Sequence, residues 1–182
     1  MSAPKKPRPS WTDVKTKLAD FDRAGLLGVI QVLYAALREN QDFLHARFGL
    51  GEDALKPYMT AIQRWLWPDV LKNQHTSVAN AKKAISDYKK AIGRPDDLAE
   101  LMVHYCEQAV GFCDDVGYED ESYFNALLRM FQQALFIIDR LPEVRRDELL
   151  DRLDTVRRRA HNFGYGVGDE MDSLLRDHGF DA

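Results

Sequence analysis

The sequence has only two cysteines, Cys106 and Cys113, among its 182 residues. Both fall in one predicted helix, and their spacing places the Cα atoms about 10 Å apart along it. A disulfide needs Cα atoms within about 7 Å of each other, so these two cysteines cannot pair with one another in that helix. Buried, reduced thiols are the expected form, and they are typical of a cytoplasmic protein.

Long apolar runs are also lacking. The most apolar stretch, residues 26–37, contains Gln31 and Tyr34 and has charged residues on both sides. It is too short to span a bilayer, so it is predicted to be a buried helix, and no membrane association is expected. Residues 1–9 are basic but have no apolar segment after them, which excludes a secretory signal.

The common catalytic and cofactor motifs do not occur. There is no His-Glu-x-x-His, paired Cys-x-x-Cys, P-loop or Gly-x-Ser-x-Gly, and no glutamate has a histidine three residues later. The glycine-rich run at residues 164–169 has no preceding strand and no third glycine at the offset that dinucleotide binding needs. We expect Gly164 to cap one helix and Asp169 to begin the next. We therefore expect no cofactor, and we favour a protein that is not an enzyme.

Charge is distributed unevenly along the chain. Residues 1–17 contain five basic residues and one acidic residue, although the whole chain has a formal net charge of −4. The body is therefore acidic, and nucleic acid is not an expected partner. Residues 1–10 are rich in proline and basic side chains, so we expect a disordered tail before a single domain over residues 11–178.

Apolar residues recur with helical spacing almost throughout this domain, and no segment alternates with the period of a strand. The spacing predicts an all-α fold of about eight helices in antiparallel pairs. Helices that begin near residues 77 and 96 are expected to form one hairpin, and those near 119 and 142 a second. Their offset of about 42 residues is in the range of HEAT-type pairs. A HEAT-like right-handed α-α superhelix and a compact orthogonal bundle both fit the pattern.

Three residues in the middle of the chain are candidate metal ligands. Glu100, His104 and Glu107 lie at positions i, i+4 and i+7 of one predicted helix, and a histidine with two carboxylates suits a hard metal ion. They lie opposite the apolar stripe of Leu101 and Tyr105, however. We therefore favour a solvent-exposed Glu–His pair over a metal site.

Two surface features are candidate contacts for a partner. Four lysines make one predicted helix basic, and they form either an interaction patch for an acidic partner or an ordinary solvated face: Lys82, Lys83, Lys89 and Lys90. Trp67 cannot share a helix face with Trp65. It either marks a partner surface or packs under the segment at residues 68–77.

Several segments together resemble a bacterial family of small all-helical proteins that is known only as a domain of unknown function. They are the stretches at residues 81–90 and 101–107, the connection at 117–123 and the glycines at 164–166. The resemblance implies a helical fold and a bacterial cytoplasmic protein. It brings no catalytic or binding residues, and Cys106 stands where the family usually has an apolar residue.

Two functions remain open from the sequence. The first is a non-enzymatic helical scaffold that binds a protein partner or a second copy of the chain. The second is a small ligand-binding or metal-binding protein, or an enzyme, whose site is assembled between helices around His104 and Glu107.

Overall fold

The computed structural model describes residues 8–50 and 53–180, so most of the predicted N-terminal tail lies outside the described residues. The described residues form nine α-helices, one short 3₁₀-helix (η1) and no strand, which confirms the predicted all-α fold. The helices in chain order are α1 (Trp11–Leu18), α2 (Arg23–Ala36), α3 (Arg38–Phe48), α4 (Lys56–Leu66), η1 (Val70–Lys72), α5 (Val78–Ala91), α6 (Pro95–Val116), α7 (Glu121–Ile138), α8 (Glu143–Ala160) and α9 (Val167–Asp177).

Local sequence signals set several helix ends. Helix α5 stops at Ala91, and Gly93 follows in the left-handed region with φ of 71°. A Cβ atom at Gly93 would lie 2.7 Å from the carbonyl oxygen of Lys89, so only glycine fits this turn. Pro95 then begins α6, where its missing N–H has no helical partner to lose. These boundaries agree with those that the sequence predicts.

The chain divides into two compact units, residues 1–44 and 45–182, and the boundary falls within α3. Unit 1 contains α1 and α2. No residue of α2 is buried, although the sequence predicts a buried helix there, and Val32 is 69% exposed. Within unit 1, the single short helix α1 supplies too little apolar surface to enclose a helix that is apolar on all sides.

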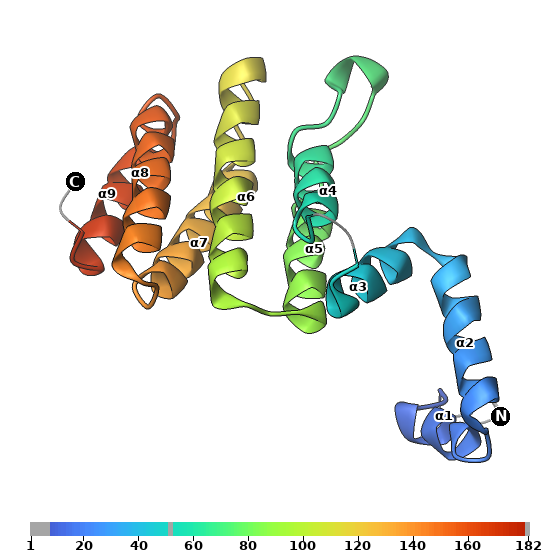
Figure 1. Cartoon of the computed structure of the whole chain (residues 1–182). Coiled ribbons are helices and arrows are strands. Elements are labelled where there is room, and N and C mark those ends of the chain that lie inside the picture. The colour runs from blue at the N-terminus through green and yellow to red at the C-terminus, as the bar shows by residue number, and fades with distance from the viewer. Residues whose placement is uncertain (1–7, 51–52, 181–182) are drawn as a thin grey trace, which may run out of the picture. The chain divides into compact units, whose positions relative to one another are not determined.

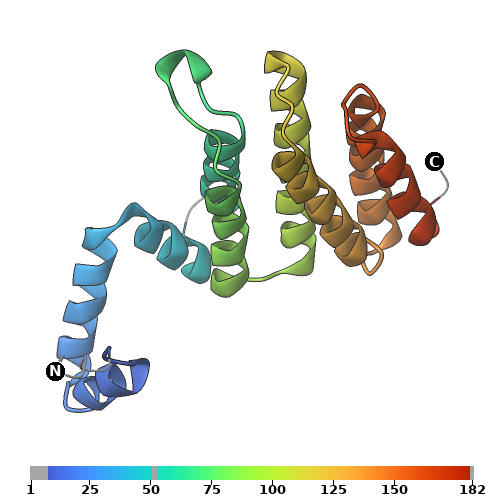
Figure 2. The same ribbon diagram turned by 180° about the vertical axis from the view of Figure 1, so that it is seen from behind.

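Unit 2 has two layers of helices. Helices α4, α6 and α8 lie side by side in one layer, and α5, α7 and α9 pack against them from the other side (Figures 1 and 2). The core lies between the layers and contains fully buried aromatic residues from α5, α6 and α7: Tyr88, Tyr105, Phe112, Phe124 and Phe131.

The helices of unit 2 pair differently from the prediction. The most extensive packing joins α4 to α5 and α6 to α7, whereas the predicted pairs, α5 with α6 and α7 with α8, contact each other less. Each helix of the first layer therefore packs on the helix that follows it. The hydroxyl of Tyr123, at the start of α7, also reaches back to the carbonyl oxygen of Leu66 at the end of α4, at 3.0 Å. Within the described residues, no helix is both long and apolar enough to cross a membrane.

Candidate functional site

Acidic residues of α6 face arginines of α8 in a regular ladder. The pairs are Glu100–Arg145, Glu107–Arg152 and Asp114–Arg159, at 2.5–2.7 Å. The two residues of each pair are 45 positions apart in the sequence. Because the offset is constant along both helices, α6 and α8 run parallel in one register. Arg152 also donates two hydrogen bonds to Glu100, so the first two steps of the ladder form one network.

His104 lies beside this ladder, on the side of α6 that faces α4. Its Nε2 is 3.3 Å from the carbonyl oxygen of Met59, and its Nδ1 is 4.0 Å from Glu107. Burial lowers the pKa of His104 below its usual value, although the Met59 carbonyl and Glu107 act in the opposite direction. The neutral imidazole is therefore the form that the fold favours.

The carboxylates of the proposed metal set are engaged in this ladder. Glu100 accepts hydrogen bonds from Arg145 and Arg152, and Glu107 accepts two from Arg152. The Glu100 side chain is only 12% exposed, so the expected solvent-exposed face is wrong. It packs against α8 instead. A metal ion at Glu100, His104 and Glu107 remains the less favoured alternative, and it would have to displace a guanidinium.

The two cysteines are free and buried. Burial raises the pKa of Cys113 to about 12, with a smaller contribution from Asp114, and it raises the pKa of Cys106 still further. A thiol with such a pKa is almost entirely protonated at neutral pH and is a poor nucleophile or metal ligand. Both thiols therefore act as small apolar groups in the core.

Trp67, a candidate partner residue, packs against α6. A Cβ atom added to Gly111 would lie 2.3 Å from the indole ring, so the ring rests directly on the glycine backbone. Trp67 keeps an exposed edge. A role for this exposed edge at a partner surface stays a prediction.

The lysines of α5 fall into two sets. Lys83 and Lys90 lie on the outward face, where both pair with Asp87. Lys82 and Lys89 lie two turns apart on one flank of α5, and neither has an ion-pair partner among the described residues. The predicted patch is therefore partly neutralised by Asp87, and its unpaired charge is on the flank.

That flank borders a groove of about 410 Å³, which we call the Phe136 groove. Phe136 of α7 is 54% exposed within it, and the guanidinium of Arg140 lies 4.0 Å from the centre of the Phe136 ring. The groove is lined by residues of α5, α6 and α7 and by the residue that follows α9: Lys89, Met102, Gln132, Gln133, Phe136, Ile137 and His178. These residues include no carboxylate, and their exposed surface is mainly apolar.

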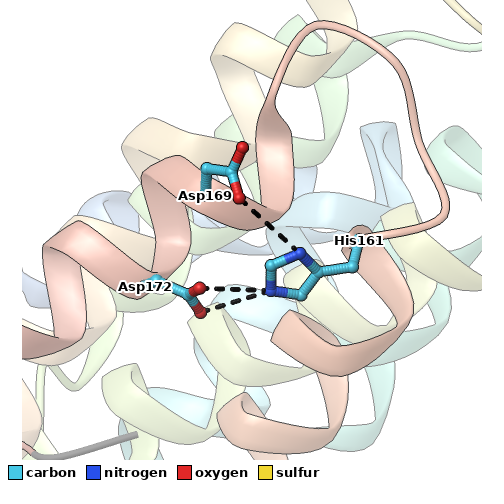
Figure 3. Close-up of side chains that lie close together, drawn as sticks. All are labelled: His161, Asp169 and Asp172. Atoms are coloured by element: carbon cyan, nitrogen blue, oxygen red, sulfur yellow. Dashed lines mark hydrogen bonds and ion pairs between the residues drawn. The ribbon is translucent and has the colours of Figure 1, made fainter.

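A second cluster of polar side chains lies at the junction of α8 and α9. His161 follows the last residue of α8 and faces Asp169 and Asp172 of α9 (Figure 3). Its Nδ1 is 3.9 Å from Asp169, and its Nε2 is 3.3 Å from Asp172. These three residues form the one group of potential metal ligands that the described residues bring together.

The two ring nitrogens of His161 face different carboxylates, Nδ1 toward Asp169 and Nε2 toward Asp172. One potential ligand atom from each of the three residues also lies within 4.8 Å of the other two. Arg157 also donates a hydrogen bond to Asp172 at 2.8 Å, which lowers the pKa of Asp172 and supplies a positive charge there. The cluster therefore acts as a polar clamp between α8 and α9.

The link before α9 differs from the sequence prediction. Helix α8 ends at Ala160 with His161 as its cap, and α9 begins at Val167 after Gly166. Gly164 is thus not the cap of α8, and Asp169 lies within the first turn of α9. The start of α9 packs closely on the end of α8, because a Cβ atom at Gly168 would come within 2.6 Å of the His161 ring.

Sequence reasoning missed the ladder and the groove, although each left a signal. The ladder repeats an acid every seven residues in α6 and an arginine every seven residues in α8. Phe136 stands outside the apolar stripe of α7, which runs through Phe131, Leu135 and Ile138. An aromatic residue that lies outside the buried face of a helix indicates an exposed apolar surface.

Comparison of the chain with protein-family models, with curated proteins and with solved structures found no match.

Proposed function

We propose that this protein is a non-enzymatic helical scaffold that binds a protein partner in the Phe136 groove. The observation that carries the proposal is the exposed ring of Phe136 in a hollow whose walls come from different helices. Partner surfaces are enriched in partly exposed aromatic residues set in such apolar hollows. The residues that line the groove lie mostly on helices, so their ordering should cost little conformational entropy when a partner binds.

The other candidate chemistries have structural roles that support this choice. The cysteines are buried with raised pKa values, and the carboxylates of the predicted metal set hold α8 against α6. In the groove, by contrast, the Phe136 ring is 54% exposed and its contact with Arg140 leaves it open to a partner. An aromatic residue exposed on a helix contributes little to the stability of the protein itself.

We further propose that α4/α5, α6/α7 and α8/α9 are successive units of a helical repeat. The parallel packing of α4, α6 and α8 supports this, because repeat proteins stack equivalent helices side by side. We also propose that the protein is bacterial and that it is located in the cytoplasm. The two free, buried cysteines support the cytoplasmic location.

Selection of a random-peptide display library on the purified chain tests the proposal. We expect the selected peptides to converge on shared side chains and to bind the free protein in solution. Phe136→Ala should abolish that binding while the thermal unfolding curve stays close to that of the wild type. Val144→Ala is the matched control, because Val144 is 84% exposed on α8 and lies outside the groove. Binding that survives Phe136→Ala, or a selection with no convergence, would contradict the proposal.

A further inference from the structure

The Phe136 groove also indicates the chemistry of its partner. We infer that the groove binds an amphipathic helix of the partner. An apolar residue of that helix contacts Phe136, and its carboxylates pair with Lys82 and Lys89. This inference rests on the proposed function. Charge, spacing and lining each support one part of this assignment.

Charge supplies the first argument. Lys89 lines the groove, and Lys82 lies two turns earlier on the same flank of α5. Neither has a carboxylate partner among the described residues, whereas Lys83 and Lys90 on the outward face share Asp87. Among the residues that the structure describes, no carboxylate lines the groove, and the guanidinium of Arg140 lies beside Phe136. The groove is therefore complementary to an acidic partner in a chain that is acidic overall.

Spacing supplies the second argument. Lys82 and Lys89 are about 10 Å apart along α5, at about 1.5 Å of rise per residue. Carboxylates two turns apart on a partner helix that lies along α5 have the same separation. A helix thus presents both charges to the two lysines without distortion.

The lining supplies the third argument. Met102 of α6 and Phe136 and Ile137 of α7 line the groove with apolar side chains. A leucine or phenylalanine on the partner helix, between its carboxylates, would cover the exposed Phe136 ring. Gln132 and Gln133 at the rim offer polar contacts that suit the edge of such an interface.

A nucleic acid is the less favoured partner for the same surface. Binding to a nucleic acid needs several cationic side chains arranged along its phosphate backbone. Two of the four lysines of α5 are already paired with Asp87. The net charge of −4 also disfavours long-range attraction of a polyanion.

A charge-swap experiment with the full chain tests the inference. The probes are three helical peptides with the same leucines, which carry glutamate, glutamine or lysine at two flanking positions two turns apart. We expect the wild type to bind the glutamate peptide most tightly and more weakly as salt is added. The double variant Lys82→Glu/Lys89→Glu should bind it roughly tenfold more weakly and should bind the lysine peptide instead.

The control is the double variant Lys83→Glu/Lys90→Glu, which makes the same change of net charge on the outward face of α5. We expect it to keep the wild-type order of affinities. Equal losses in both double variants, or binding that is indifferent to peptide charge, would overturn the inference. So would a labelled single-stranded oligonucleotide that binds with the same dependence on Lys82 and Lys89.

The two proposals fail in different ways. If display-selected peptides depend on Phe136 but contain no acidic residues, the scaffold proposal stands and the acidic-helix inference is wrong. If binding of the selected peptides and of the designed peptides is independent of Phe136, both are wrong.

Discussion

Single residues of this protein show how closely its helices approach. Gly111 is buried in α6, where glycine costs about 1 kcal/mol of helix stability relative to alanine. The Trp67 ring occupies the space that a side chain at residue 111 would need. The glycine is therefore required by packing and not by backbone conformation.

Gly111→Ala should lower the free energy of unfolding by about 1–3 kcal/mol, because the new methyl group collides with the ring of Trp67. Urea denaturation followed by tryptophan fluorescence measures both the loss and the displacement of the indole. Gly164→Ala is the control, since a Cβ atom there meets Glu119 no closer than 3.7 Å. A Gly111→Ala protein as stable as the wild type would show that Trp67 is not held against α6.

His104 should make the stability of the protein depend on pH. Burial lowers the pKa of its imidazole in the folded state below the usual value for histidine. Below that value the unfolded chain binds a proton that the folded protein resists, so stability should fall as the pH is lowered. We expect His104→Gln to reduce the difference in Tm between pH 7.5 and pH 5.5, as measured by circular dichroism. If the difference in Tm between the two pH values is the same in His104→Gln as in the wild type, His104 is not a buried, neutral histidine.

At the scale of elements, the ladder fixes the register of α6 against α8. A shift of one turn would separate every acid from its arginine, because all three pairs share one offset of 45 residues. Arg152 is the central member, with hydrogen bonds to both Glu100 and Glu107. The ladder thus selects one packing among several that the apolar faces would allow.

Arg152→Ala should lower the free energy of unfolding by about 1–3 kcal/mol, because it leaves the largely buried Glu100 with fewer donors. Arg158→Ala should change it by less than about 0.5 kcal/mol, since Arg158 is exposed and its one ion pair with a described residue is to Asp154 of the same helix. Thermal unfolding of the two variants side by side makes the comparison. Equal effects would mean that the ladder contributes nothing beyond an ordinary surface pair.

At the scale of the whole molecule, the sequence predicts the helices better than their arrangement. Gly93 and Pro68 end helices through local backbone geometry, so their effects can be inferred from neighbouring residues. The ladder joins α6 to α8, and the groove combines residues from α5, α6, α7 and the end of α9. Which helices become neighbours depends on the packing of the entire core, and no local pattern contains that information.

The same limit applies to the candidate sites. Glu100 and Glu107 pair with arginines of α8 that lie 45 residues away in sequence, whereas His104 between them contacts the Met59 carbonyl of α4. Lys82 and Lys89 belong to the predicted basic patch, but the fold is needed to show that Lys89 lines a groove between α5, α6 and α7. Phe136 is a candidate contact residue because it lies in a groove, and the groove is formed by helices that are distant in the sequence.

Amide hydrogen exchange over the whole chain tests the central claim, that the Phe136 groove is a docking site, most directly. The protein is measured with and without the leucine–glutamate helical peptide. We predict slower exchange in the second half of α5 and around residues 132–137 of α7, with α4 and α8 unchanged. Unchanged exchange at the groove, or protection confined to other helices, would contradict the claim.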